Sequence, residues 1–364
     1  AAAEDPSTIF FNPAGMSMLD STQLQAQAHW LTLGAYFSND GSHLGTKDND
    51  LGPITGRNND GGFSVVVPSL YFVHPLPGGF TAGLAVNSPF GLATKYDSDW
   101  VGRYMAVKSE IKTIDVSPCI SYQVNDRFSI GAGLDVYTIE ANLTNAIDLN
   151  QDGTPLLDGF SNLEADDDAL GAHLGLLWQA RPDTRLGVNY RSQVVAHVKG
   201  DADFAVPPAL AGSAGLVFFD QNVSSTLRLP ASASLSVLHN LNDKIDLMAD
   251  ITWTDWSSFG TLDIDFANPA TEAVAGREIP EEWRDTWRYS AGVSYKWSDT
   301  LKLRGGVCYD TAAVKSSRYR SPRIPDAARL WLTCGLSWRM AEHSVLDFGY
   351  VHIFVEDGGI NNDS

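Results

Sequence analysis

Residues 114–124 read IDVSPCISYQV, and this stretch decides the fold because its apolar and polar residues alternate. Successive side chains of a β-strand point to opposite faces, so an extended chain would place the apolar set on one side. That set consists of Ile114, Val116, Pro118, Ile120, Tyr122 and Val124. The pattern predicts a strand with one apolar and one polar face, and about a dozen stretches along the chain repeat it.

The predicted strands number thirteen, and their connections alternate between short and long. Short connections lie near 75–79, 125–127, 180–183, 240–243, 298–299 and 340–343. Long connections fill 38–62, 88–109, 145–168, 195–223, 257–284 and 311–328. Short periplasmic turns and long outer loops are typical of bacterial outer-membrane barrels. We therefore predict an all-β fold, a transmembrane antiparallel β-barrel that crosses the outer membrane many times and occupies residues 22–364.

The two ends of the chain carry further expectations. A single-chain barrel closes with an even number of strands, so we expect fourteen, the last one following Ser364. The first residues lack the basic and apolar regions of a signal peptide, which indicates a processed or trimmed start. Fourteen strands enclose more space than wall side chains fill. Residues 1–21 are predicted to plug that space as an N-terminal hatch, with apolar bulk at Phe10 and Phe11 and a turn at Asn12, Pro13 and Ala14.

Composition excludes several functions. Acidic residues outnumber basic ones by 44 to 25, which argues against nucleic-acid binding. The sequence shows no HExxH, GxSxG, phosphate-loop or dinucleotide motif, so we predict no enzyme, no metal and no cofactor. The acidic run Asp166–Asp168 is interpreted as part of a solvated surface loop. Three widely spaced cysteines are expected to be packing residues: Cys119, Cys308 and Cys334.

Several stretches carry a family resemblance and follow one another in the expected order. They are AEDPSTIFFNPAG at 3–15, GLAT at 91–94, TWTDWS at 252–257, DTWR at 285–288, IPD at 324–326 and RLWL at 329–332. In these the chain resembles the FadL family of outer-membrane transporters of long-chain fatty acids and hydrocarbons. The resemblance implies a fourteen-stranded barrel, a hatch built on Asn12-Pro13-Ala14, and an apolar pocket that Phe10 and Phe11 line or adjoin.

The resemblance also implies a route out of the barrel. A ligand captured from outside would leave sideways into the membrane through a gap at a kink of the third strand. The matching positions are Asn87, Ser88, Pro89, Phe90 and Gly91. Proline cannot donate to a sheet ladder and glycine weakens one, so the sequence itself indicates a break there. The basic residues that hold a carboxylate in the family find neutral Asn142 and Thr144 in the corresponding region, which leaves Arg277 as the candidate.

The function predicted from these features is uptake of hydrophobic small molecules, with long-chain fatty acids as the expected ligand. A channel for neutral aromatic hydrocarbons is the alternative within the same class. An outer-membrane lipid hydrolase and a soluble all-β adhesin or carbohydrate binder are the alternatives from other classes. The expected partners are the hydrophobic ligand, outer-membrane lipid and lipopolysaccharide, and the protein is expected to be a monomer.

Overall fold

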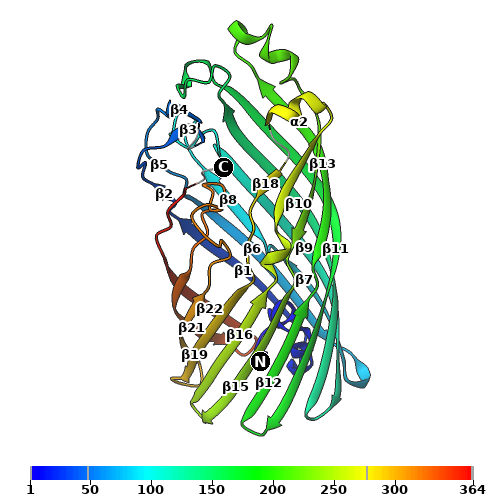
Figure 1. Ribbon diagram of the computed structural model, residues 1–364. Helices are drawn as coiled ribbons and strands as arrows, with labels where there is room; N and C mark the ends of the chain where they lie inside the picture. The colour runs from blue at the N-terminus through cyan, green and yellow to red at the C-terminus, as the bar shows by residue number, and fades with distance from the viewer. Residues whose placement is uncertain (1, 47–48, 276–277, 362–364) are drawn as a thin grey trace.

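The computed structural model describes residues 2–46, 49–275 and 278–361. Eighteen strands form one large sheet that curves into a barrel (Figure 1). These strands are β1 (Gln23–Leu33), β6 (Phe63–Pro75), β7 (Phe80–Asn87), β8 (Gly91–Lys95), β9 (Lys108–Asn125), β10 (Phe128–Ile147), β11 (Gly159–Arg181), β12 (Thr184–Arg191), β13 (Val194–Ala205), β14 (Gln221–Leu229), β15 (Ser232–Asn242), β16 (Ile245–Thr254), β17 (Thr261–Phe266), β18 (Glu278–Pro280), β19 (Thr286–Lys296), β20 (Leu301–Asp310), β21 (Arg329–Ala341) and β22 (Ser344–Val355).

Shorter elements precede the barrel or lie in its connections. They are α1 (Thr8–Phe11), η1 (Pro13–Met18), β2 (Tyr36–Phe37), β3 (His43–Thr46), β4 (Asn49–Pro53), β5 (Asn59–Asp60), η2 (Pro77–Gly79), η3 (Pro155–Leu157), η4 (Pro208–Leu210), η5 (Ala214–Leu216), η6 (Trp256–Ser258) and α2 (Pro269–Ala275). None of the helices in the described part of the chain is both long and apolar enough to cross a membrane.

The barrel has as many strands as the sequence predicts if each interrupted strand is counted once. A strand counted in this way is called a stave below. Five pairs of successive strands each form one interrupted stave: β7 with β8, β12 with β13, β14 with β15, β16 with β17, and β18 with β19. When each pair is counted once, the part of the chain that the structure describes has thirteen staves. All ladders between neighbouring staves are antiparallel, as in the pairing of β9 with β10.

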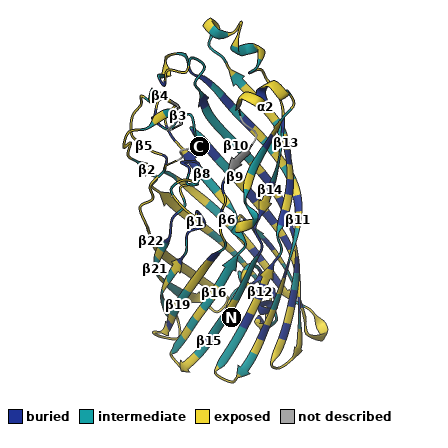
Figure 2. Cartoon of the chain, viewed as in Figure 1, coloured by how far each residue is buried: buried dark blue, intermediate teal, exposed yellow. Residues whose placement is uncertain are grey.

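The alternation within each stave also follows the prediction. In β9, Ile114 and Ile120 are exposed on the outside, whereas Asp115 and Ser117 are buried inside the barrel. Figure 2 shows the same alternation of buried and exposed residues along β11. Outward apolar side chains and inward polar ones are the reverse of a water-soluble sheet and match a wall that faces lipid.

Above this apolar band the polarity of the wall reverses. On β10 the outward residues change from Leu134 and Val136 to Thr138 and Glu140, while the inward Tyr137 and Ile139 are apolar and fully buried. The pairing partners on β11 change in step, because Leu170 lies opposite Val136 and Asp168 lies opposite Thr138. The barrel therefore extends beyond the lipid as a polar-walled tube with an apolar interior.

This reversal corrects the predicted loop boundaries. Much of 145–168 and 195–223 is not loop, since β11 begins at Gly159 and β13 continues to Ala205. Asp166 and Asp168 are exposed, as expected, but on a strand. The acidic outward residues concealed the strands because the prediction required the outward phase to be apolar.

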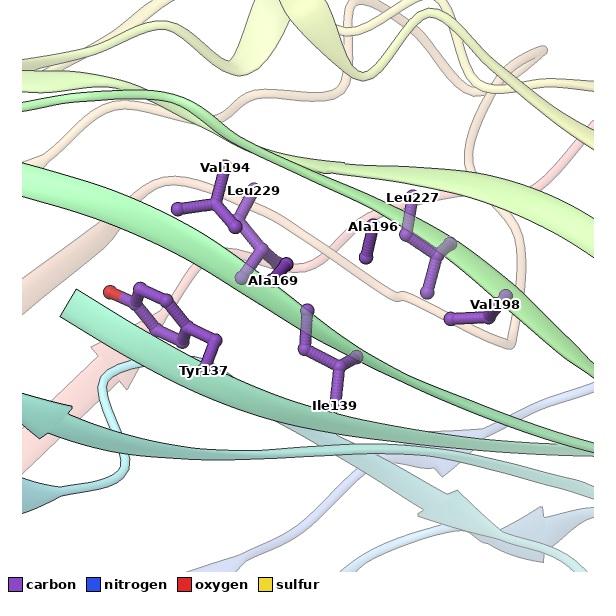
Figure 3. Packing of buried hydrophobic residues seen from close by; sticks show 8 residues of the cluster. All are labelled: Tyr137, Ile139, Ala169, Val194, Ala196, Val198, Leu227 and Leu229. Carbon is purple, nitrogen blue, oxygen red and sulfur yellow. The ribbon is translucent and has the colours of Figure 1, made fainter.

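The apolar interior of the upper barrel is one packed cluster. Figure 3 shows Tyr137 and Ile139 of β10 facing Val194, Ala196 and Val198 of β13, with Leu227 and Leu229 of β14 and Ala169 of β11 beside them. Half-buried apolar residues from the strand break and the loops extend this cluster: Phe90, Ile111, Ala141, Ala165, Phe259 and Leu262. The interior of the upper barrel is therefore apolar.

Candidate functional site

The N-terminal segment, residues 2–21, lies inside the barrel near its lower end in Figure 1 and is called the hatch segment below. Asn12 joins its two short helices, and its Oδ1 accepts the backbone N–H of Ala14 at 3.1 Å. Its Nδ2 donates to the carbonyl oxygens of Leu176 on β11 at 3.1 Å and Val188 on β12 at 3.0 Å. The predicted turn at Asn12–Ala14 is thus present and bonded to the barrel wall. Its movement as a hatch stays a prediction.

Glycines in the wall make room for this turn. A Cβ atom at Gly131 of β10 would overlap with the backbone of Pro13 and Ala14. One at Gly175 of β11 would overlap with Oδ1 of Asn12. The backbone of the hatch segment can therefore lie directly against the sheet only because these inward positions carry no side chain. Glycines at inward positions of predicted strands can therefore indicate where another segment packs against the wall, which the alternation of apolar and polar residues alone does not indicate.

The two predicted hatch aromatics have different surroundings. Phe10 is half-buried and packs against the apolar cluster that Ile9 and Met16 form with the wall. Phe11 is 65% exposed and meets Phe10 edge to face, with ring centroids 5.2 Å apart. Neither ring lines the apolar cavity described below, so the expected contact with a binding pocket is not found at this cavity.

Polar contacts fix the start of the hatch segment to the barrel wall. The Glu4 carboxylate lies 2.9 Å from Nζ of Lys302 and 3.0 Å from Nη2 of Arg304, both on β20. Nη1 of Arg185 on β12 donates to the carbonyl oxygen of Ala2 at 2.9 Å. The start of the segment is therefore held between β12 and β20.

The third stave breaks where the sequence predicts. β7 pairs with β9 as far as Asn87 opposite Asp115, and β8 resumes with Gly91 opposite Lys112. Three residues, Ser88–Phe90, therefore lie opposite the two residues 113 and 114, so the stave carries one residue too many for a regular ladder.

The break also leaves a gap on the other side of the stave. The ladder between β6 and β7 stops at Leu70 opposite Val86, and the rest of β6 pairs with β1. Between β6 and β8, no ladder joins the residues that the structure describes. A stretch of the wall beside the break is therefore held without backbone hydrogen bonds across it.

Residues of the break point to different sides. Phe90 faces inward, where its backbone N–H donates to Oγ1 of Thr113 at 3.2 Å and its carbonyl accepts from the same hydroxyl at 2.6 Å. Its ring lies 6.5 Å from that of Tyr137 and 6.3 Å from that of Trp256. Asn87 is 5% exposed, and neither atom of its amide has a described hydrogen-bond partner. Ser88 is exposed.

An apolar cavity opens in the upper barrel beside the break. The space between its walls, including the part that is open to solvent at its mouth, is about 670 Å³. Its wall is made mainly of aliphatic and aromatic side chains from β9, β10, β11, β14, β17 and the loop before β17: Ile111, Leu143, Leu163, Leu227, Leu262 and Phe259. Ile111 and Phe259 also belong to the cluster that contains Phe90, so cavity and strand break adjoin.

Two buried charged side chains line this cavity, and no sequence pattern predicted either of them. Arg323 is 9% exposed, and its guanidinium donates to Oγ of Ser109 at 3.3 Å and to Oδ1 of Asn145 at 3.0 Å. The backbone of the same segment is held by β8, since Oγ1 of Thr94 donates to the Arg323 carbonyl at 3.2 Å. Glu281 is 3% exposed and accepts from the indole N–H of Trp283 at 3.2 Å.

Asn142 and Thr144, the neutral residues at the positions where the family resemblance would place basic ones, are not among the residues that line this cavity. Arg277 lies outside the described residues. Asn142 faces outward, where its Nδ2 donates to Oε1 of Glu164 at 2.7 Å, and the cavity is lined instead by its neighbours Ala141 and Leu143. Arg323 could not be recognised from the sequence because it stands in a long loop without strand alternation, one residue before the Ile-Pro-Asp motif.

The chain is similar to known proteins along its whole length. Residues 1–364 match the family model described as outer membrane protein transport protein (OMPP1/FadL/TodX). A putative outer membrane protein of Neisseria meningitidis is 30% identical over 98% of this chain and 82% of its own length. A long-chain fatty acid transport protein of Escherichia coli is 27% identical over 97% of this chain and 82% of its own.

Solved structures show the same architecture. A FadL homologue of Pseudomonas aeruginosa superposes with a TM-score of 0.80 at 27% identity, covering 97% of this chain and 86% of that one. The toluene transporter TbuX of Ralstonia pickettii superposes with a TM-score of 0.69 at 20% identity, covering 95% and 88%, and this likeness concerns the fold.

Proposed function

Because the chain belongs to the FadL and TodX family of outer membrane transport proteins, and so is an outer-membrane transporter of hydrophobic compounds, we propose that it takes up long-chain fatty acids. The fatty acid binds in the apolar cavity with its carboxylate on Arg323 and leaves sideways at Ser88–Phe90. Transfer of the alkyl chain out of water drives binding, at about 25 cal/mol per Å² of apolar surface buried.

Arg323 is the observation that carries the choice of ligand. A buried guanidinium in an otherwise apolar wall is suited to a carboxylate, because charge-assisted hydrogen bonds are the strong ones. Its two described side-chain partners, Ser109 and Asn145, are neutral. Among the described residues, no carboxylate lies within hydrogen-bond distance of the Arg323 guanidinium. The relative from Escherichia coli named as a long-chain fatty acid transport protein supports the same choice.

Neutral aromatic hydrocarbons are the second candidate, and a group of rings that begins at Phe259 in the cavity wall favours them. Trp283 lies 5.1 Å from Trp256 and 4.8 Å from Phe259, and Phe90 meets Trp256 edge to face. Rings arranged in this way offer edges and faces to an aromatic ligand. The likeness in fold to a toluene transporter agrees with this alternative.

The lateral route is supported by the wall beside the cavity. The surplus residue at Ser88–Phe90 and the missing ladder between β6 and β8 lie at the height where the outward residues change from apolar to polar. A ligand that passes Phe90 would therefore meet the upper edge of the lipid.

Binding measurements with purified protein in detergent separate the two ligands. Palmitate and toluene are titrated by calorimetry against the natural sequence and against Arg323→Gln. We expect Arg323→Gln to weaken palmitate binding about tenfold to a hundredfold, the range of a charged hydrogen bond of about 1.5 to 3 kcal/mol, and to leave toluene binding unchanged. Arg57→Gln, in an exposed loop pair with Asp99, is the matched control.

Equal palmitate affinity in a folded Arg323→Gln variant would reject the carboxylate contact, and tighter binding of toluene than of palmitate would favour the hydrocarbon. Incubation with acyl esters addresses the hydrolase alternative, for which release of free acid would be the positive result. We expect none.

A further inference from the structure

Four buried side chains form a charged layer on the inner wall of four neighbouring strands, and the proposed function gives them no role. They are Asp115 of β9, Asp135 of β10, His173 of β11 and Arg191 of β12, called the charge layer below. Nη1 of Arg191 lies 3.3 Å from Oδ2 of Asp115 and 2.9 Å from Oδ1 of Asp135. Nδ1 of His173 lies 2.8 Å from the same Asp135 oxygen. Oγ of Ser117 lies 2.8 Å from both carboxylates and can donate its one proton to either.

The height of the charge layer can be followed along the inward residues of β10. Ala141 and Leu143 line the cavity, and Tyr137 packs against Phe90 of the strand break. Asp135 comes next, and Gly131 below it receives the turn of the hatch segment. On this wall the charge layer therefore lies between the cavity and the hatch segment, and it begins at the strand break, because Asp115 lies opposite Asn87.

The chemistry of the charge layer is unfavourable to an alkyl chain. Oδ1 of Asp115, Oδ2 of Asp135 and both amide atoms of Asn87 have no described partner and require hydrogen bonds that an alkyl chain does not supply. An apolar group that moved down would also have to separate Arg191 from its two carboxylates, which leaves buried charges unpaired.

Arg191 connects the charge layer to the hatch segment. Its Cζ lies 4.7 Å from the centroid of the Phe10 ring, and its Nη2 donates to the Phe10 carbonyl at 3.5 Å. The first contact is a cation–π interaction with the guanidinium over the ring face. Whatever holds Arg191 in place therefore also holds the top of the hatch segment.

We propose that the charge layer closes the lumen below the cavity to alkyl chains and so directs the ligand to the strand break, with Arg191 as the positioning residue that also holds Phe10. This inference rests on the proposed function, because it explains why a ligand bound in the cavity leaves sideways. It assigns a directional role to residues that contact neither the cavity nor the outer surface.

Photo-crosslinking tests where the ligand goes. The full-length protein in lipid vesicles is loaded with a palmitate analogue that carries a diazirine at its methyl end, illuminated, and digested for mass spectrometry. We expect labelled peptides from the cavity and from Ser88–Phe90, and at least tenfold less label on Asn12–Met16. Label on Asn12–Met16 equal to that on Ser88–Phe90 in the unmodified protein would overturn the proposal.

Two variants weaken the charge layer to different degrees. Asp115→Leu/Asp135→Leu/Arg191→Met replaces the ion pairs by apolar groups of similar size, a change that buried ion pairs often tolerate. Arg191→Gln is the milder variant. We expect label on Asn12–Met16 to rise about tenfold or more in the triple variant and less in Arg191→Gln. Arg288→Met is the matched control, since Arg288 also combines a carboxylate, Asp310 at 3.0 Å, with an aromatic ring, Trp331 at 5.2 Å.

The outcomes separate the two hypotheses. Folding is checked by the heat-dependent mobility of the barrel in electrophoresis. An unchanged label distribution in a folded triple variant overturns the role of the charge layer. Label in the cavity in the same experiment leaves the proposed function intact. If the triple variant does not fold, the same criterion applies to Arg191→Gln. Absence of label from both the cavity and Ser88–Phe90 contradicts the proposed function itself.

Discussion

Glu281 and Arg323 share the wall of one apolar cavity, so the ionisation of one affects what the other can bind. Burial raises the pKa of Glu281 to about 7, although the indole of Trp283 and the charge of Arg323 act in the opposite direction. Burial lowers the pKa of Arg323 to about 10, so Arg323 stays charged at neutral pH. As the pH rises through about 7, the net charge of Glu281 and Arg323 together therefore changes from positive to neutral.

This pair predicts that carboxylate binding depends on pH. Below pH 7 Glu281 is neutral and Arg323 is unopposed, whereas above pH 7 the Glu281 carboxylate competes with the ligand for the same guanidinium. The ligand carboxylate, with an ordinary pKa of about 4.3, is ionised throughout the range that matters. We expect palmitate affinity to fall about tenfold between pH 6 and pH 8, measured by calorimetry.

Controls for this prediction lie in the same loop. Glu281→Gln should remove the pH dependence, and Glu282→Gln, a change at the exposed neighbour that pairs with Lys315, should keep it. Toluene binding should not change with pH in any variant. A palmitate affinity that is the same at pH 6 and pH 8 in the unmodified protein would show that Glu281 does not compete.

At the level of elements, the third stave carries one surplus residue between its two ladders with β9. Asn87 and Gly91 keep regular partners on β9, and the irregularity is confined to the residues between them. A bulge of this kind bends a strand and ends its pairing on one side, which is where the ladder to β6 also stops. The break is thus a local property of Ser88–Phe90.

Deletion of Pro89 alone should therefore make the stave continuous. With one residue removed, two residues of the third stave would lie opposite residues 113 and 114 of β9, and β8 could keep its register with β9. We expect the deletion to reduce transfer of labelled palmitate into vesicle lipid at least tenfold while palmitate binding in the cavity is retained. Pro89→Ala, which keeps the surplus residue, should transfer like the unmodified protein. A folded deletion variant with normal transfer would exclude the lateral route.

The sequence predicted the staves and the break because both depend on local rules. Alternation follows from the geometry of a single strand, and Pro89, which cannot donate to a ladder, lies among the residues of the break. The cavity could not be predicted in this way, because Arg323 and Glu281 are brought together from separate loops by the folding of the sheet into a barrel. The outer halves of β11 and β13 were missed for another reason, since there the rule that apolar residues face outward no longer holds.

At the level of the whole molecule, the wall has two zones with opposite polarity. Leu174 and Asp166 lie on the same outward phase of β11, eight positions apart, and both are exposed. The first belongs to the apolar band and the second to the polar extension above it. The barrel is therefore taller than the lipid that surrounds it, and its cavity lies in the part that projects.

Arginine substitutions can measure the boundary between these zones. We expect Leu174→Arg to lower the free energy of unfolding by about 2 to 4 kcal/mol in lipid vesicles, because a charge would face the bilayer core. Asp166→Arg should change it by less than about 0.5 kcal/mol, as is usual for exposed surface positions. Guanidinium titration in vesicles gives both values. Equal losses for the two variants would contradict the assignment of Asp166 to the projecting zone.

The bonds of Asn12 also constrain the order in which the molecule assembles. Its two carbonyl partners lie 164 and 176 residues further along the chain. The four residues of α1 are too few to form a stable helix alone. The hatch segment precedes these strands in the chain and therefore becomes ordered only after β11 and β12 have paired. The growing barrel has to enclose an unfolded strand of chain, and the plug takes its shape from the wall that closes around it.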